Sequence, residues 1–169
     1  GVNAVALTDT NAVTLAGGTF GGTLTVIANG AITQTGALLV TGVSSFNAQA
    51  GAITLTTATN DFTGAVSLLN TGVNAVALTD TNAVTLGAST VGGTLTVLAG
   101  GPITQTGALA VTGVSSFNAG ANAITLTTAA NDFTGAVSLL NTGVNAVALT
   151  DTNAVTLGAS TVGGTLTVL

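Results

Sequence analysis

Apolar and polar residues alternate in short runs along the whole chain. Val, Leu and Ile alternate with Thr in runs such as NAVTLG at residues 82–87 and GTLTVLA at residues 93–99, and Gly, Asn or Ser separates one run from the next. A period of two places the apolar side chains on one face of a half-buried β-strand. No run has the spacing and caps of an amphipathic helix, so the pattern predicts an all-β protein.

The same pattern returns at a fixed interval. The segment GVNAVALTDTNAVTL begins at Gly1, Gly72 and Gly143, a period of 71 residues. Residues 1–71 and 72–142 differ at 11 positions, so 60 of 71 match, and residues 143–169 repeat residues 72–98 without a change. We therefore divide the chain into copy 1 (residues 1–71), copy 2 (residues 72–142) and a partial copy 3 (residues 143–169), and expect one continuous solenoid that is an excerpt of a longer chain.

The spacing of the runs predicts how the chain winds. Copy 2 contains nine candidate strands, at residues 74–81, 82–87, 93–99, 102–107, 108–113, 115–120, 123–128, 131–136 and 137–141. Three strands per coil give about 24 residues per coil, about three coils per copy and about seven in the whole segment, each about 4.8 Å from the next. Because crossovers between parallel strands are right-handed, we expect a right-handed parallel β-helix, with a two-faced or four-coil winding as alternatives.

Superimposing strands three apart predicts which side chains stack. Val76, Ile103 and Ile124 should form one inward column. One corner should collect a ladder of stacked amides, in which Asn tolerates the sharp turn, at Asn82, Gly107 and Asn131 and at Asn11, Asn60 and Asn153.

All five Asp residues flank this predicted corner: Asp9, Asp61, Asp80, Asp132 and Asp151. Their oxygens could form a weak calcium site. We favour turn capping instead, because the glycine-rich nonapeptide of calcium-binding β-rolls is absent.

Composition removes most functional chemistry. The chain has no Lys, Arg, His, Cys, Met, Trp, Tyr or Glu, and its net charge is −5. Acid–base catalysis, nucleophilic catalysis and transition-metal binding depend largely on these residue types. The sequence therefore predicts a non-enzymatic protein with no catalytic, cofactor-binding or metal residue and no cofactor.

The charge balance and hydropathy also limit the partners. Without a cation the chain cannot neutralise phosphates, so we expect no nucleic-acid binding. No apolar stretch approaches the roughly 18 residues of a spanning helix, so we expect no membrane insertion. The low surface charge offers little protection against association, and end-to-end or side-by-side self-association is expected.

Several residue types have a structural explanation. The five Phe residues, of which four recur in SSFN and NDF, should fill the core, and glycines such as Gly92 and Gly93 should form corners. Pro102 opens a predicted strand, where its missing N–H costs least.

The blocks ITQTGALAVTG, SSFNAGANAITLT, NDFTGAVSL and NAVALTDTNAVTLG resemble the repeats of filamentous haemagglutinin-like proteins and other giant bacterial adhesins over essentially the whole chain. The resemblance implies a secreted β-helical passenger of the autotransporter type, exported to the bacterial cell surface and used in attachment, biofilm or filament formation. What it implies for this chain is the role of a structural shaft, with any host or surface receptor contacted through other regions.

Two alternatives come from other functional classes. Thr-x-Thr pairs could form an ice-binding array, although we expect Thr104 and Thr125 to align and Thr96 to lie elsewhere. A polysaccharide-cleaving enzyme would need two carboxylates about 5–10 Å apart. Asp9, Asp80 and Asp151 should lie one copy apart, roughly 14 Å, whereas Asp61 and Asp80 could approach one another at one corner on successive coils.

Overall fold

All pairs of neighbouring strands in successive coils run parallel. In the computed structural model, which describes residues 3–169, Val5 pairs with Leu24 and Ile53 pairs with Val76. The structure contains 23 strands in about eight coils, and no helix occurs among these residues. The parallel β-solenoid expected from the alternation and the repeat is confirmed.

The strands form three faces. The first face contains β1 (Val5–Asp9), β4 (Leu24–Ala28), β7 (Ser44–Asn47), β10 (Val66–Asn70), β13 (Ser89–Val91), β16 (Leu109–Val111) and β19 (Asp132–Phe133). The second contains β2 (Val13–Leu15), β5 (Ile32–Gln34), β8 (Ile53–Leu55), β11 (Val76–Asp80), β14 (Leu95–Ala99), β17 (Ser115–Asn118), β20 (Val137–Asn141) and β22 (Thr161–Val162). The third contains β3 (Gly18–Phe20), β6 (Leu38–Val40) and β9 (Asp61–Phe62), and in later coils β12 (Val84–Leu86), β15 (Ile103–Gln105), β18 (Ile124–Leu126), β21 (Val147–Leu149) and β23 (Leu166–Val168). β12 pairs with β10 of the first face through Leu86 and Val66, and does not pair with β9.

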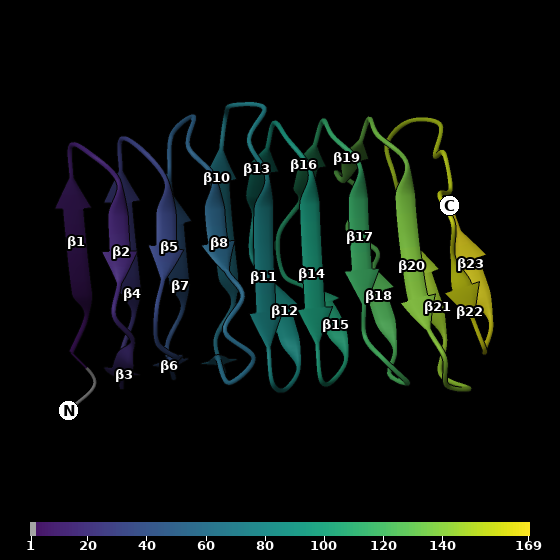
Figure 1. Ribbon diagram of the computed structural model, residues 1–169. Helices are drawn as coiled ribbons and strands as arrows, with labels where there is room; N and C mark the ends of the chain where they lie inside the picture. Colours follow the sequence, from purple (N-terminus) through teal and green to yellow (C-terminus); the bar gives the residue numbers. More distant parts are fainter. Residues whose placement is uncertain (1–2) are drawn as a thin grey trace.

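The winding is visible in Figure 1. Strands of the second face, such as β11, β14, β17 and β20, descend at the front, while strands of the first face rise behind them. The chain meanwhile advances from the N-terminus on the left to the C-terminus on the right. This combination is the right-handed crossover that parallel strands prefer.

Each copy contains ten strands, one more than predicted. Copy 1 holds β1 to β10 and copy 2 holds β11 to β20. The additional strand is β13, whose sequence in GASTV has the composition of a turn. Ten strands at three per coil make three and one-third coils, so each coil is shorter than predicted.

The extra third of a coil rotates each copy relative to the one before. β1 lies on the first face, its repeat equivalent β11 lies on the second face, and β21 lies on the third. The rotation overturns part of the predicted stacking. Ile103 does pair with Ile124, but Val76 lies on the second face between Ile53 and Leu95.

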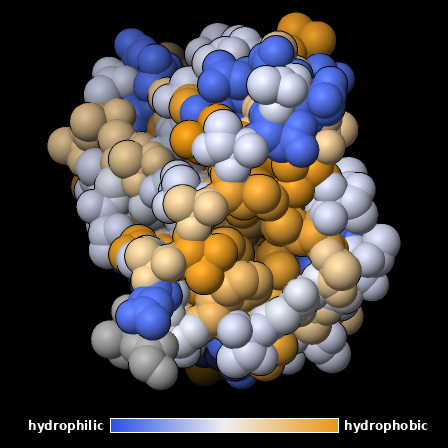
Figure 2. Space-filling view, turned by 90° about the vertical axis from the view of Figure 1, so that its left-hand side faces the viewer, coloured by the Kyte–Doolittle hydropathy of each residue, from blue (hydrophilic) through white to orange (hydrophobic). Residues whose placement is uncertain are grey.

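The core fills the interior between the three faces. Burial alternates along the strands, as in Val76–Asp80, where every second residue is buried. Four Phe side chains are at most 2% exposed, and they meet in two edge-to-face pairs with ring centroids 6.0 Å apart, Phe46 with Phe62 and Phe117 with Phe133. Phe20 is half-buried and packs against this core. The view along the axis shows apolar residues in the middle and polar residues around them (Figure 2).

Glycines occupy corners where successive coils touch. A Cβ on Gly93 would lie 2.1 Å from the carbonyl oxygen of Asn74, and one on Gly113 would lie 2.3 Å from that of Gly93. Only glycine fits such an approach of two backbones. Pro102 directly precedes β15, as its position in the sequence predicted.

The all-β structure also bears on helical membrane spans. Among residues 3–169 there is no helix with the length and apolarity needed to cross a bilayer.

Candidate functional site

The predicted Asn ladder does not form. Asn11 lies at the corner between the first and second faces, Asn60 and Asn82 lie between the second and third, and Asn131 and Asn153 lie between the third and first. The prediction assumed that a copy holds a whole number of coils. Because each copy rotates by a third of a turn, equivalent residues reach different corners.

Two of these Asn residues are instead buried links between coils. Asn60 is fully buried, and its Oδ1 accepts hydrogen bonds from Gln34 Nε2 at 2.8 Å and from the Leu38 N–H at 2.9 Å. Its Nδ2 donates to Gln34 Oε1, to the Leu55 carbonyl and to the Thr79 carbonyl. One amide thus joins the coil before it, its own coil and the coil after it.

The same network recurs one copy later. Asn131 bonds Gln105 in both directions, accepts from the Leu109 N–H and donates to the Thr150 carbonyl. Asn11, Asn82 and Asn153 are exposed. The sequence shows no difference between the two sets of Asn, except that Asn60 and Asn131 stand in the motif N-D-F.

Asp80 links copy 2 to copy 1. Its Oδ2 accepts the Phe62 N–H at 2.7 Å and its Oδ1 accepts the Asn82 N–H at 2.7 Å, while the residue is only 2% exposed. Burial raises the pKa of the Asp80 carboxyl, the two N–H groups partly offset this effect, and the nearby Asp61 carboxylate raises the pKa further.

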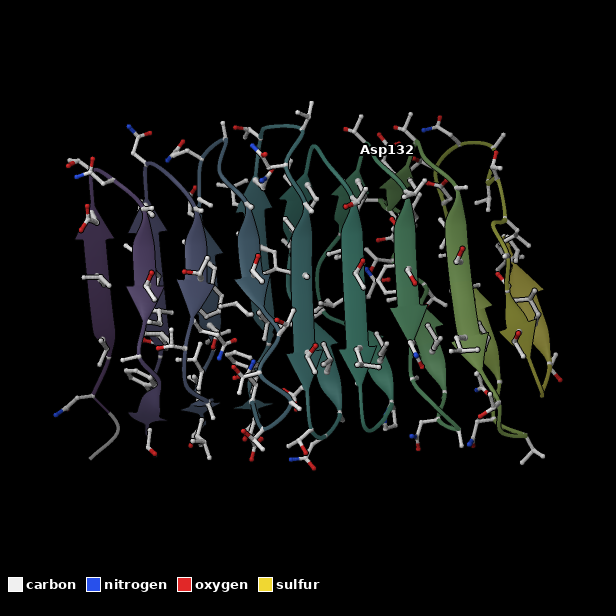
Figure 3. All side chains as sticks on the ribbon, viewed as in Figure 1. Asp132 is labelled. Carbon is white, nitrogen blue, oxygen red and sulfur yellow. The ribbon has the colours of Figure 1, made fainter. Side chains whose placement is uncertain are left out.

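Of the other four Asp residues, Asp151 is buried like Asp80, and the remaining three are more exposed. Asp151 is buried and its Oδ1 accepts the Phe133 N–H at 3.1 Å. Asp9 is exposed, and Asp61 is half-buried. Asp132 is exposed at the margin of the solenoid, where Asn153 Nδ2 donates to it (Figure 3).

The expected proximity of Asp61 and Asp80 is therefore present, but Asp80 is engaged by backbone N–H groups inside the molecule. In residues 3–169 no three acidic, His or Cys side chains gather into a group that could hold a metal ion.

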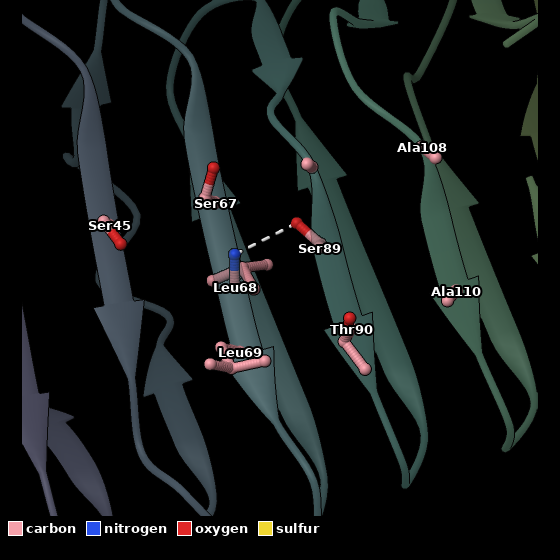
Figure 4. Close-up of a pocket in the computed structure, with 9 residues that line it drawn as sticks. Ser45, Ser67, Leu68, Leu69, Ser89, Thr90, Ala108 and Ala110 are labelled. Atoms are coloured by element: carbon pink, nitrogen blue, oxygen red, sulfur yellow. Dashed lines mark hydrogen bonds between the residues drawn. The ribbon is translucent and has the colours of Figure 1, made fainter. Parts of the chain in front are cut away.

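A shallow hollow lies on the first face where copy 2 follows copy 1. Its volume is about 390 Å³ and its lining is small and uncharged: Ser45, Ser67, Leu68, Leu69, Ala88, Ser89, Thr90, Ala108 and Ala110. The Ser89 hydroxyl accepts the Leu68 N–H at 3.0 Å (Figure 4). It also donates to the Gly87 carbonyl. The hydroxyl takes the place of a backbone carbonyl as acceptor for the Leu68 N–H. The sequence pattern predicted neither this role of Ser89 nor the strand β13.

Outward Thr side chains form rows that run along the axis. On the second face Thr14, Thr33 and Thr54 stand in register, followed by Ala77 and Thr96. In copy 2 the equivalent row lies on the third face and contains Thr104 and Thr125. The prediction that these two residues align while Thr96 lies on another face is confirmed. The hydroxyls of Thr14 and Thr33 lie 3.0 Å apart, so they hydrogen-bond one another.

The junctions between copies recur at a constant spacing, and a family profile matches the chain at the same spacing. The family described as repeats of unknown function (DUF5649) matches residues 2–69, 73–140 and 144–169. The chain belongs to this family. No curated protein and no solved structure matches it.

Membership of the DUF5649 repeat family agrees with the geometry of the solenoid. The matched segments begin at residues 2, 73 and 144, which are equivalent positions of the three copies. At the first junction, the side chains that link one DUF5649 repeat to the next include those of Asn60, Asp80 and Ser89, alongside the strand pairs β8–β11 and β10–β13.

Proposed function

We propose that the chain is part of a structural shaft whose function is to span distance. The observation that carries this proposal is the repetition of one junction. At the first junction, Phe62 N–H donates to Asp80 and Leu68 N–H donates to Ser89. At the second junction, Phe133 N–H donates to Asp151 and Leu139 N–H donates to Ser160. A junction that repeats with the same residues lets copies be added without any change in chemistry.

The use of polar groups supports a non-enzymatic role. The side chains of Asn60, Asp80 and Ser89 are buried and bonded to backbone groups of neighbouring coils. The hollow on the first face has no charged residue in its lining. The polar residues of the junction thus support stacking, and a reaction at neutral pH would need groups that the composition does not supply.

We further propose that the shaft belongs to a secreted bacterial adhesin or extracellular filament at the cell surface. The support is the resemblance of its sequence blocks to haemagglutinin-like repeats, together with the absence of the oxidation-prone residues Cys, Met, Trp, Tyr and His. Self-association of rods end to end or side by side, and receptor contacts through other regions, belong to the same proposal.

A deletion of one copy tests the shaft. In the producing cell, removal of residues 72–142 leaves the junction sequence intact, because Gly143 follows Thr71 just as Gly72 does. We expect the protein to reach the surface, detected by antibody on intact cells, and to project about 16 Å less, which is three and one-third coils of about 4.8 Å. Unchanged projection in electron micrographs, or a protein retained inside the cell, would contradict the proposal.

A second variant separates the shaft from the alternatives. Replacing the exposed Asp9 and Asp132 and the half-buried Asp61 with Asn removes most of the accessible carboxylates. We expect attachment to be unchanged, whereas loss of an activity on polysaccharide would favour an enzyme. Thermal hysteresis of the purified chain would favour the ice-binding alternative.

A further inference from the structure

Each junction between copies buries one carboxylate in a chain that has no cationic side chain. Asp80 closes the first junction and Asp151 closes the second, with exposures of 2% and 8%. A buried carboxylate is normally paired with a cation or fully hydrogen-bonded. Here the charge of Asp80 has only backbone N–H groups as partners, and the surrounding apolar residues deprive it of solvation.

The surroundings of Asp80 are well defined. Its carboxylate accepts from Phe62 N–H of the preceding copy and from Asn82 N–H of its own turn. In the coil above, Ala99 pairs with Asp80, and in the coil below, Asp61 on β9 is the titratable group that faces it. The Asp61 charge has the same sign as that of Asp80, so it opposes ionisation.

We propose that the junction is an acid-strengthened joint, in which a proton on the Asp80 carboxyl tightens the stacking of copy 2 on copy 1. A protonated carboxyl removes the buried charge and the repulsion from Asp61, and its carbonyl oxygen still accepts an N–H from the neighbouring turn. The joint therefore holds the copies together more firmly in acid than at neutral pH.

The direction follows from proton linkage. Burial places the pKa of Asp80 in the folded chain above the ordinary value of 3.8 that it has when unfolded. Between these two values the folded chain binds more protons than the unfolded chain, so the free energy of unfolding falls as the pH rises. The added stability is fully present below the unfolded value and is lost as the pH rises through the folded value.

The repeat supplies a matched control. Asp9 occupies the position of Asp80 in copy 1 and also accepts the N–H of the residue two positions later, Asn11, but it is exposed. Asp9→Asn and Asp80→Asn change the net charge equally. Any difference between them therefore comes from the junction.

Thermal unfolding of the full chain at pH 7 and pH 4 tests the joint. We expect the melting temperature of the wild type and of Asp9→Asn to be higher at pH 4 than at pH 7. In Asp80→Asn this rise in melting temperature should be smaller by about 2 to 4 °C. Equal gains in the two variants would overturn the proposal, as would a wild type that melts lower in acid.

A second measurement needs no variant. In wild-type chain labelled with ¹³C at the Asp carboxyls, we expect the Asp80 signal to titrate above the ordinary value of 3.8, accompanied by the Phe62 amide. If Asp80→Asn fails to fold, this titration decides alone. An Asp80 signal that titrates at or below 3.8 would refute the joint.

Discussion

At the residue scale, copies 1 and 2 place different residues at one turn where the backbone is left-handed. After β7 the chain turns through Gln49, which has a φ of 51°, and at the same position after β17 it turns through Gly120, with a φ of 57°. Left-handed backbone costs a residue with a Cβ about 1–2 kcal/mol, whereas Gly adopts it freely. A Cβ at Gly120 would meet no atom within 4 Å, so packing does not decide the choice.

We therefore expect Gln49→Gly to raise the free energy of unfolding by about 1 kcal/mol, because it relieves the left-handed turn without removing a packed side chain. Chemical denaturation measures the change. The reverse substitution, Gly120→Gln, should lower stability by a similar amount. Two changes of the same sign would contradict this account of the corner.

At the scale of the elements, the alternation predicted most strands and their inward residues but missed β13. The segments around Val76–Asp80 and Ile124–Leu126 show clear alternation of apolar residues with Ala or Thr, and both form strands. In β13 the inward residue at the start is Ser89, which a hydropathy pattern cannot distinguish from a turn residue. Its hydroxyl becomes useful only when the coil below presents the Leu68 N–H.

The missed strand also explains the errors at the candidate site. Without β13 a copy holds nine strands, which is a whole number of three-stranded coils, and equivalent Asn residues stack at one corner. With ten strands the corners change from copy to copy. The burial of Asn60 and Asn131 depends on contacts with Gln residues 26 positions earlier, and a local pattern does not contain this information.

The hydroxyl of Ser89 gives a prediction for β13. Ser89→Ala leaves the buried Leu68 N–H without an acceptor, so we expect a loss of about 1–2 kcal/mol in the free energy of unfolding. Hydrogen exchange should show faster exchange at Leu68. The control is Ser116→Ala on β17, where the side chain is half-buried on an outward position and the change should stay within about 0.5 kcal/mol. Equal losses in the two variants would show that the hydroxyl of Ser89 has no special role.

At the scale of the whole molecule, equivalent positions of the repeat follow a screw path around the rod, because each copy holds three and one-third coils. The loops that carry Val73 and Val144 have the same sequence, and both side chains are 90% exposed. Val73 lies between the first and second faces and Val144 lies between the second and third. A feature of the repeat thus winds around the rod and returns to the same side after three copies, or ten coils.

This screw can be measured by adding copies. The chain contains no cysteine, so spin labels at Val73→Cys and Val144→Cys are unique. Between adjacent copies the axial advance is about 16 Å, and we expect a longer label distance because the labels also sit at different corners. With two further copies inserted between them, the labels stand three copies apart at the same corner. Their distance should then equal the axial advance alone, about 48 Å. If the label distance over three copies were instead three times the distance over one copy, each copy would hold a whole number of coils. In that case identical loops would form a straight line, and the rod would present a single side to its neighbours.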